Sequence, residues 1–315
     1  MNSCKQMGGV CKSAYKFAQL ALVAGGLLAA GLSPAGAAVP APFEPLTEIR
    51  DVDLPELSGL AASRRWPGIY WAHNDSGGTP TLYAFNRRGE VIARVAIDGA
   101  EAVDWEDLAL YEHDGRSWLA IADTGDNLAW RSSVSIYLLP EPALDASRAA
   151  VSRHIEFRYP EGPRDAEGLA VDAEGGRLLV MEKAVPRAAL YSLPLDAPPG
   201  VVLAERVAEV ALRRPTPPRP AEPLSAPRGA GSVTAMDLSR DGRELVLMTY
   251  GFVFDFARAP GESWAQVLAQ PPRVWRLPRI KGLEAMAIEP DGRSLVVAPE
   301  GMPSAVWRAK GILGR

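Results

Sequence analysis

Cysteine is almost absent from this sequence. Of its 315 residues only two are cysteines, Cys4 and Cys11, and both precede an apolar run at the N-terminus. If that region is removed, the remaining chain can form no disulfide, no catalytic thiol and no thiolate-ligated metal site. Histidine is also scarce, with three residues.

Basic runs and several catalytic motifs are missing as well. The chain has 34 Lys and Arg against 38 Asp and Glu, a net charge of −4, which argues against nucleic acid as a partner. No Gly-x-Ser-x-Gly sequence supports serine-hydrolase chemistry, and no Gly-rich phosphate-binding loop occurs. With 47% hydrophobic and 23% charged residues, the composition is that of a soluble globular protein.

The sequence has a single long hydrophobic run, at the N-terminus. Three lysines precede the apolar segment 17–32, and a small-x-small pattern ending at Ala37 follows it. This order predicts a secretory signal peptide over residues 1–37, cleaved near Ala37. An uncleaved anchor is the alternative, although the run is short for a membrane span.

The chain that remains after cleavage carries 31 basic and 38 acidic residues. Its basic side chains are nearly all Arg, and this Ala/Arg/Pro-rich usage suggests a bacterium with a GC-rich genome. We therefore expect a secreted or periplasmic protein with no membrane attachment after cleavage.

The rest of the chain repeats one pattern five times. Similar segments open the repeats, at 55–63, 104–112, 165–173, 232–240 and 282–290. A tight turn follows each segment, and then a continuously apolar run, which is typical of a strand covered on both faces. A third strand carries an aromatic residue at a fixed place, namely Tyr83, Tyr137, Tyr191, Phe254 and Trp307.

A fourth strand precedes each following repeat, but the fifth repeat lacks its own. Residues 46–50 near the N-terminus can supply it. The pattern thus predicts an all-β fold, a β-propeller of five four-stranded blades closed by an N-terminal strand. Residues 38–45 are interpreted as a short linker and 46–315 as a single propeller domain. Six blades, or a β-sandwich with coincidental repeats, are the alternatives.

A Pro-rich insertion at 213–231 lengthens the third interval between repeats. Its composition is incompatible with a hidden blade. It contains four arginines, so it is interpreted either as a basic loop that covers a ligand or as a mobile solvated loop.

The propeller arrangement predicts an acidic channel mouth. The start of each innermost strand and the end of each second strand lie on one rim, where about ten oxygen-bearing side chains converge. Glu106, Glu167 and Glu284 occupy the same position in their repeats. Such charge requires a bound cation, protonation, or basic partners such as Lys183, Arg64 and Lys281. Oxygen ligands favour calcium, with magnesium the second choice.

Other rim residues are candidates for substrate contact and catalysis. Glu106 and Glu167 are the candidate catalytic carboxylates, and His73 is the one histidine placed to act as a general base, with a structural role as its alternative. Two tryptophans, Trp105 and Trp130, are either ligand contacts or inter-blade packing. The predicted substrate-binding residues are Glu182, Lys183, Glu300 and Trp105.

Several segments resemble a group of secreted bacterial β-propeller proteins between Pro55 and Trp307. These segments are LSGLAASRRWPGIYWAHNDSG, DWEDLAL, IADTGDN, DAEGLAVD and VTAMDLSRDGRELVLMTY. More distantly, the E-G-L-A and D-G-R patterns are similar to gluconolactonase/regucalcin-like, strictosidine-synthase-like and phytase-like propellers. Those relatives usually have six blades, whereas this sequence predicts five.

The lactonase-like resemblance implies one divalent cation in the channel, held by Glu, Asn and Asp side chains. Carried onto this sequence, the implied metal ligands are Asn74, Asp75, Glu106, Asp123, Asp126, Glu167 and Glu284. The expected function is calcium-dependent hydrolysis of an ester, lactone or phosphoester. The alternative is a binding propeller, for a small molecule, a carbohydrate or a protein, with a structural cation or none. The protein is expected to be a monomer.

Overall fold

The computed structural model describes residues 39–40, 42–212 and 231–314. The predicted signal peptide and nearly all of the Pro-rich insertion lie outside the described residues. Among the described residues, no helix combines the length and apolar character needed to cross a bilayer.

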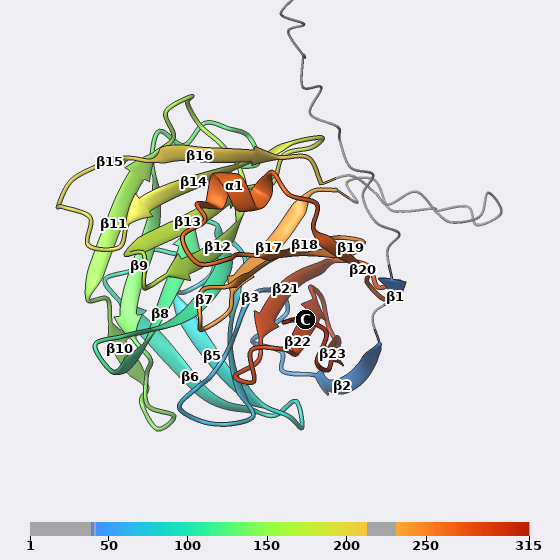
Figure 1. Cartoon of the computed structure of the whole chain (residues 1–315). Helices are drawn as coiled ribbons and strands as arrows, with labels where there is room; N and C mark the ends of the chain where they lie inside the picture. The colour runs from blue at the N-terminus through green and yellow to red at the C-terminus, as the bar shows by residue number, and fades with distance from the viewer. Residues whose placement is uncertain (1–38, 41, 213–230, 315) are drawn as a thin grey trace, which may run out of the picture. The chain divides into compact units, whose positions relative to one another are not determined.

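Five four-stranded antiparallel sheets form the blades of a β-propeller (Figure 1). From the innermost to the outermost strand, the first three blades are β3 (Leu57–Ala62), β4 (Ile69–Asn74), β5 (Thr81–Asn86) and β6 (Val91–Asp98); β7 (Trp105–His113), β8 (Arg116–Asp123), β9 (Val134–Pro140) and β11 (Arg153–Arg158); and β12 (Ala166–Asp172), β13 (Arg177–Glu182), β14 (Ala188–Pro194) and β16 (Glu205–Val210). The last two are β17 (Val233–Leu238), β18 (Glu244–Thr249), β19 (Phe252–Ala257) and β20 (Arg273–Arg276); and β21 (Leu283–Ile288), β22 (Leu295–Pro299), β23 (Ser304–Ala309) and β2 (Phe43–Ile49). The prediction of five blades is confirmed.

Short elements add to this plan. Three edge strands, β1 (Val39–Pro40), β10 (Arg148–Ala150) and β15 (Val202–Leu203), pair in parallel with outermost strands of blades. The helix α1 (Trp264–Leu268) lies in the connection between β19 and β20.

The N-terminal strand completes the last blade, as predicted. β2 pairs antiparallel with β23 from Phe43↔Ala309 to Ile49↔Ser304. It starts earlier than the expected strand 46–50, so residues 43–45 of the expected linker belong to the propeller. Pro45 is tolerated because β2 is an edge strand and the register shifts between Pro45 and Thr47.

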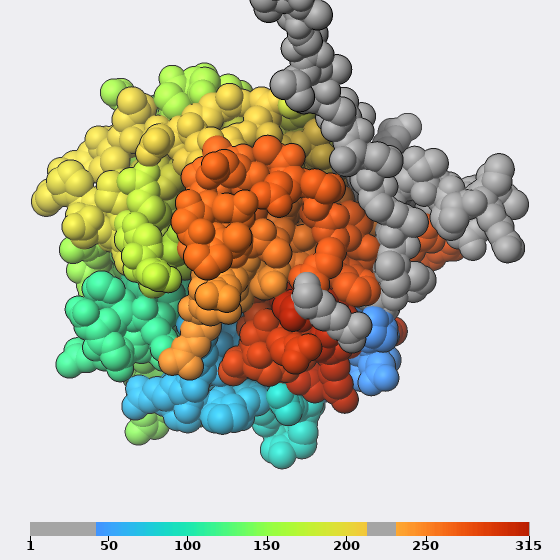
Figure 2. Space-filling model, in the orientation of Figure 1, coloured from blue at the N-terminus to red at the C-terminus, as the bar shows by residue number. Residues whose placement is uncertain are grey.

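Apolar side chains pack between neighbouring blades. Each of five buried clusters joins strands of two adjacent blades, which is why the inner strands are apolar on both faces. Blade 4, in orange, lies next to blade 5, in red, in the space-filling view (Figure 2). Burial between blades therefore holds the ring together.

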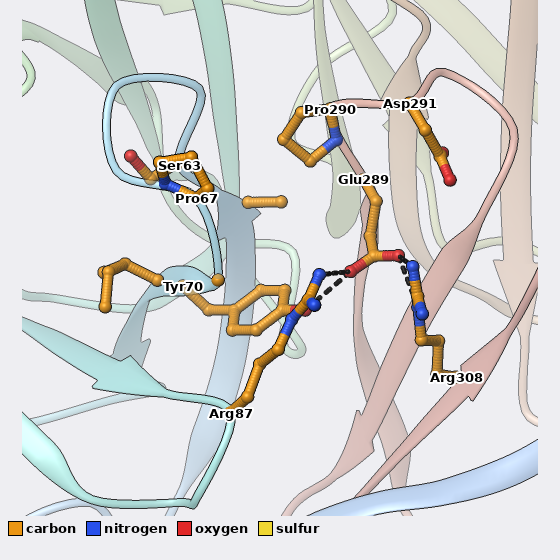
Figure 3. Close-up of a pocket in the computed structure, with 11 residues that line it drawn as sticks. Ser63, Pro67, Tyr70, Arg87, Glu289, Pro290, Asp291 and Arg308 are labelled. Carbon is orange, nitrogen blue, oxygen red and sulfur yellow. Dashed lines mark hydrogen bonds and ion pairs between the residues drawn. The ribbon is translucent and has the colours of Figure 1, made fainter.

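A polar cluster joins blade 5 to blade 1 where the ring closes. Buried Glu289 accepts a hydrogen bond of 2.7 Å from the Tyr70 hydroxyl and pairs with Arg87 at 3.1 Å, both from blade 1. Arg308 of blade 5 binds its other carboxylate oxygen. These side chains line a cavity of about 140 Å³ (Figure 3). Burial and the bond to Glu289 raise the pKa of Tyr70 to about 12.

Replacing Glu289 with alanine is expected to weaken this closure. The change leaves the Arg308 guanidinium without its buried counter-ion, which costs about 3 kcal/mol of unfolding free energy. Glu90→Ala is the control, because the Arg88–Glu90 pair is exposed and such pairs contribute little. Equal unfolding midpoints in urea for the two variants would contradict a role in closure.

Candidate functional site

Strand pairing brings polar residues of several blades to one rim of the channel. The start of each innermost strand pairs with the end of its second strand, as in Trp105↔Asp123 and Ala166↔Glu182. Backbone bonds also tie the rim together across blades, since Trp105 N–H donates to the carbonyl of Asp75 at 3.1 Å. The predicted convergence at one mouth therefore follows from the topology.

Two groups of three carboxylates lie at this mouth, with their oxygen atoms within 4.8 Å of one another. One group is Asp75, Asp104 and Glu106, and the other is Glu106, Asp165 and Glu167. Glu106 belongs to both, so it is the centre of the arrangement. Its exposed fraction is 6%, and that of Glu167 is 4%.

Two further carboxylates extend the arrangement to blade 5. The charge of Glu300 acts on Glu284, and the Tyr250 hydroxyl donates to Glu284 at 2.8 Å. Their charges act on Asp75 across the mouth. We call the following seven residues the acidic mouth: Asp75, Asp104, Glu106, Asp165, Glu167, Glu284 and Glu300.

Among the described residues, one basic side chain pairs with a residue of the acidic mouth, namely Lys183, whose ammonium contacts Glu167 Oε1. The opposite carboxylate oxygen, Glu167 Oε2, is buried and has no hydrogen-bond partner among the described residues. The same holds for Asp75 Oδ1. Negative charge at the acidic mouth is therefore only partly compensated.

Burial raises the pKa values of five of these carboxyl groups, namely those of Asp75, Asp104, Glu106, Glu167 and Glu284. It is the first cause for Asp75, whose pKa rises to about 7 with help from Asp104, Glu284 and Glu300. Burial and the neighbouring carboxylates raise the pKa of Glu106 well above its usual value. Burial also raises the pKa of Glu167, although Lys183 opposes the change. The acidic mouth thus holds protons near neutral pH unless a cation replaces them.

This charge predicts an unusual pH dependence of stability. A folded pKa of about 7 for Asp75, above the usual 3.8, means that stability falls as pH rises between these values. In the presence of a chelator, the melting temperature should be a few degrees higher near pH 5 than near pH 8. The Asp75→Asn variant should show a smaller difference, and an equal or reversed difference would contradict the assignment.

The residue Gly125 allows the carboxylates to approach the backbone. A Cβ atom at this position would lie 2.2 Å from Glu106 Oε1 and 2.4 Å from Asp104 Oδ2. Any larger residue would therefore displace these two side chains. Next to it, Asp126 N–H donates to Asp165 Oδ1 at 2.9 Å, so the loop after β8 is part of the wall of the acidic mouth.

In three of the predicted metal ligands, the side-chain oxygen atoms bond to neighbouring protein groups and are not open to an ion. Asp123 accepts from Asp104 N–H at 3.1 Å and pairs with Arg131 at 2.9 Å. Asp126 accepts the backbone N–H groups of Trp130 and Arg131. Asn74 bridges backbone groups of residues 53 and 56. These side chains lie at the rim but hold its loops in place.

His73 lies near the end of β4, where the sequence places it, but its side chain is not exposed at the rim. Its ring is fully buried, with Nδ1 2.9 Å from the carbonyl oxygen of Asn74 and a T-shaped contact with the Trp105 ring. It packs over Gly59, where a Cβ would come within 2.1 Å of Nε2. Burial lowers the pKa of His73 to about 4. A buried neutral ring of this kind is poorly placed to take a proton from a ligand.

The remaining candidates divide between packing and the acidic mouth. Trp105 is buried among apolar residues of blades 1 and 2 and donates to the carbonyl of Glu101 at 2.7 Å, as its packing alternative predicts. Glu182 accepts from Ala189 N–H. Lys183 and Glu300 belong to the charged arrangement described above. Trp130 is exposed.

Three members of the acidic mouth are absent from the predicted metal-ligand set: Glu300, which was predicted to bind substrate, and Asp104 and Asp165, which were not among the candidates. Each of the two aspartates precedes its glutamate by two residues at the start of an inner strand. Side chains two residues apart on a strand share a face, so the D-x-E spacing was a usable signal for both.

The fold resembles several solved propellers at low sequence identity. A gluconolactonase from Xanthomonas campestris is 14% identical, with 89% of this chain and 98% of that chain covered and a TM-score of 0.45. The allergen Mala s 1 of Malassezia sympodialis is 12% identical, with 86% and 96% covered and a TM-score of 0.48. The PQQ-bound aldose sugar dehydrogenase of Streptomyces coelicolor is 11% identical, with 87% and 99% covered and a TM-score of 0.43.

Comparison by sequence gives a family assignment. No curated protein matches the chain significantly. The phytase-like family model, described as esterase-like activity of phytase, matches residues 53–305. This match spans most of the chain, from the loop before β3 into β23, and includes every residue of the acidic mouth. The chain therefore belongs to the phytase-like family.

Proposed function

We propose that the protein is a hydrolase of an ester, lactone or phosphoester that depends on a divalent cation, calcium, at the acidic mouth. The observation that carries this proposal is the incompletely compensated group of buried and half-buried carboxylates around Glu106. The family description, esterase-like activity of phytase, supports the choice of reaction class.

The residues of the acidic mouth fit a hard cation. All donors are carboxylate oxygens, which calcium prefers and which it takes in flexible numbers. The group of Asp75, Asp104 and Glu106 is favoured over the second group, because Lys183 already neutralises part of Glu167. Buried oxygen atoms without partners, and a glycine that leaves room beside two carboxylates, further support a bound ion.

Different residues of the chain would then have separate roles in the proposed reaction. Asp75, Asp104 and Glu106 would hold the cation, which when bound polarises a substrate oxygen and makes water more acidic. Glu167 Oε2 is free to accept a proton from the attacking water, while Lys183 fixes the other oxygen of the same carboxylate. Tyr250, held by Glu284, offers a hydroxyl at the same mouth.

The proposals for cellular location and oligomeric state come from the sequence. The N-terminal segment 1–37 has the order of a secretory signal, so we propose export to the periplasm or the medium. We further propose that the exported protein is a monomer. A cleaved N-terminus near Ala38, found by mass spectrometry of protein exported from a bacterial host, would support the first point.

The alternative is a propeller that binds a ligand without turnover, or one whose cation is structural. Tight pairing of Lys183 with Glu167 favours this alternative, because it compensates charge without a metal. Saturable binding of a ligand recovered unchanged would support it. A large fall in melting temperature on chelation, without hydrolysis, would indicate a structural cation.

Turnover by the Glu167→Gln variant tests the catalytic role assigned here. We expect kcat to fall by about a hundredfold or more, with calcium affinity changed much less. Activity is measured on p-nitrophenyl butyrate, a lactone and p-nitrophenyl phosphate, with calcium or with chelator. Glu44→Gln, on the exposed edge strand β2, is the control. Unchanged kcat in Glu167→Gln would exclude Glu167 as the base.

A further inference from the structure

Most of the exposed apolar side chains lie on the face of the propeller that carries the acidic mouth. Six of the nine large apolar side chains that are exposed among the described residues lie in loops that join blades or that follow second strands, which end on this rim. We call them the apolar rim: Val52, Val103, Leu128, Trp130, Val185 and Met302. Single exposed apolar residues are ordinary, but their concentration on one face marks a binding surface.

The most exposed part of the apolar rim lies on the loop after β8. Trp130 is 74% exposed and Leu128 66% exposed. Between them, Ala129 has a positive φ of 52°, a conformation that non-glycine residues rarely adopt. The backbone of this short segment thus holds two large apolar side chains in solvent.

The same loop is held rigidly against the acidic mouth. Asp126 accepts from the backbone N–H groups of Trp130 and Arg131, at 3.0 and 2.9 Å. The Arg131 guanidinium in turn bonds the carbonyl of Gly125 and pairs with Asp123. A Cβ at Gly125 would overlap the carboxylates of Asp104 and Glu106, so the loop passes close to both. The loop thus presents a fixed apolar surface beside the charged group, as ligand sites commonly do.

Charge narrows the kind of molecule that fits this surface. The acidic mouth has seven carboxyl groups, and in the described part of the chain Lys183 pairs with Glu167 while the charge of Arg131 acts on Asp104. Even with one divalent cation bound, a multiply charged phosphate would meet unfavourable negative potential there. A neutral polar group beside an apolar chain matches both the acidic mouth and the apolar rim.

We propose that the substrates are neutral esters or lactones with an apolar group, which Trp130 and Val103 contact while the ester carbonyl lies at the acidic mouth. This inference rests on the proposed function and narrows it. In the reaction, water adds its hydroxyl to the acyl carbon, the acyl C–O bond breaks, and the leaving oxygen takes the proton. The products are a carboxylic acid and an alcohol, with no change of oxidation state.

The test compares p-nitrophenyl esters of acetate, butyrate and octanoate with p-nitrophenyl phosphate, all with calcium. We expect kcat/KM to rise roughly threefold for each added methylene that the apolar rim buries. The phosphate should be hydrolysed at least about a hundredfold less efficiently than the octanoate. A preference for the phosphate, or no rise with chain length, would overturn the inference and leave the proposed hydrolase intact.

Variants separate the apolar rim from a general effect on the fold. Trp130→Ala should raise KM for the octanoate roughly tenfold, with little change in KM for the acetate. A purely structural role of Trp130 would change KM for both esters alike. Val103→Ala and Val201→Ala form a matched pair, at 50% and 54% exposure, because Val201 lies away from the apolar rim. Only Val103→Ala should weaken the preference for the longer chain.

Binding gives a readout that does not need turnover. The ether p-nitrophenyl octyl ether, which is not hydrolysed, should bind the wild-type protein in titration calorimetry and bind Trp130→Ala more weakly, with Val201→Ala unchanged. Equal affinity for the wild type and Trp130→Ala would overturn the inference even if no ester is turned over. Absence of hydrolysis for every ester and the phosphate would instead refute the proposed function.

Discussion

Replacing Glu106 with glutamine is expected to abolish cation binding and to reduce hydrolysis by roughly a hundredfold or more. Glu106 is the one residue shared by both carboxylate groups of the acidic mouth. The substitution keeps the size of the side chain and removes its charge, so the loss would come from the missing ligand. Calcium affinity by titration calorimetry and turnover of a p-nitrophenyl ester measure the two effects.

The stability of the variant distinguishes this explanation from misfolding. Removing one of several repelling buried carboxylates relieves an unfavourable charge, so the metal-free Glu106→Gln protein should melt at or above the temperature of the metal-free wild type. Glu44→Gln controls for loss of an exposed carboxylate. Calcium affinity and activity equal to those of the wild type would show that Glu106 is not a ligand.

Adding a methyl group at Gly125 is expected to weaken calcium binding almost as much as the Glu106→Gln substitution. In Gly125→Ala the new Cβ would overlap the carboxylates of Glu106 and Asp104, and both would have to leave their positions. We expect calcium affinity to fall at least about tenfold, although no ligand atom is removed. The measurement is the calcium titration used for Glu106→Gln, together with a thermal melt.

Gly78 provides a matched control on the same rim. A Cβ at Gly78 meets no atom within 4 Å, so Gly78→Ala should bind calcium as the wild type does. If Gly125→Ala and Gly78→Ala bind calcium equally well, the backbone at residue 125 does not shape the cation site.

The fold could be predicted because its signal is repeated. Each of the five repeats carries the same order of turn, apolar run and aromatic strand, and the missing fourth strand of the last repeat pointed to the N-terminal segment that β2 forms. The start of β2 was harder to predict. A proline such as Pro45 indicates the end of a strand. The register shift beside it, which lets the edge strand continue, is visible only in the structure.

The candidate site could be predicted in position but only partly in detail. The order of the strands brings the rim carboxylates together, regardless of which hydrogen bonds each side chain makes. Hydrogen bonding within loops is not visible in a sequence, so Asp123 and Asp126 looked like Asp104 and Asp165 although they bind Arg131 and backbone groups instead. The burial of His73, which favours its structural alternative, could not be predicted for a similar reason, because it depends on Gly59 and Trp105 from other strands.

The most direct test of the central claim is the calcium content of the purified protein. After dialysis against dilute calcium, elemental mass spectrometry should find about one ion per chain in the wild type and in Glu44→Gln, and almost none in Glu106→Gln. The bound ion should be removed by a chelator together with the hydrolytic activity. No bound calcium in the wild type, or the same amount in Glu106→Gln, would contradict a cation site at the acidic mouth.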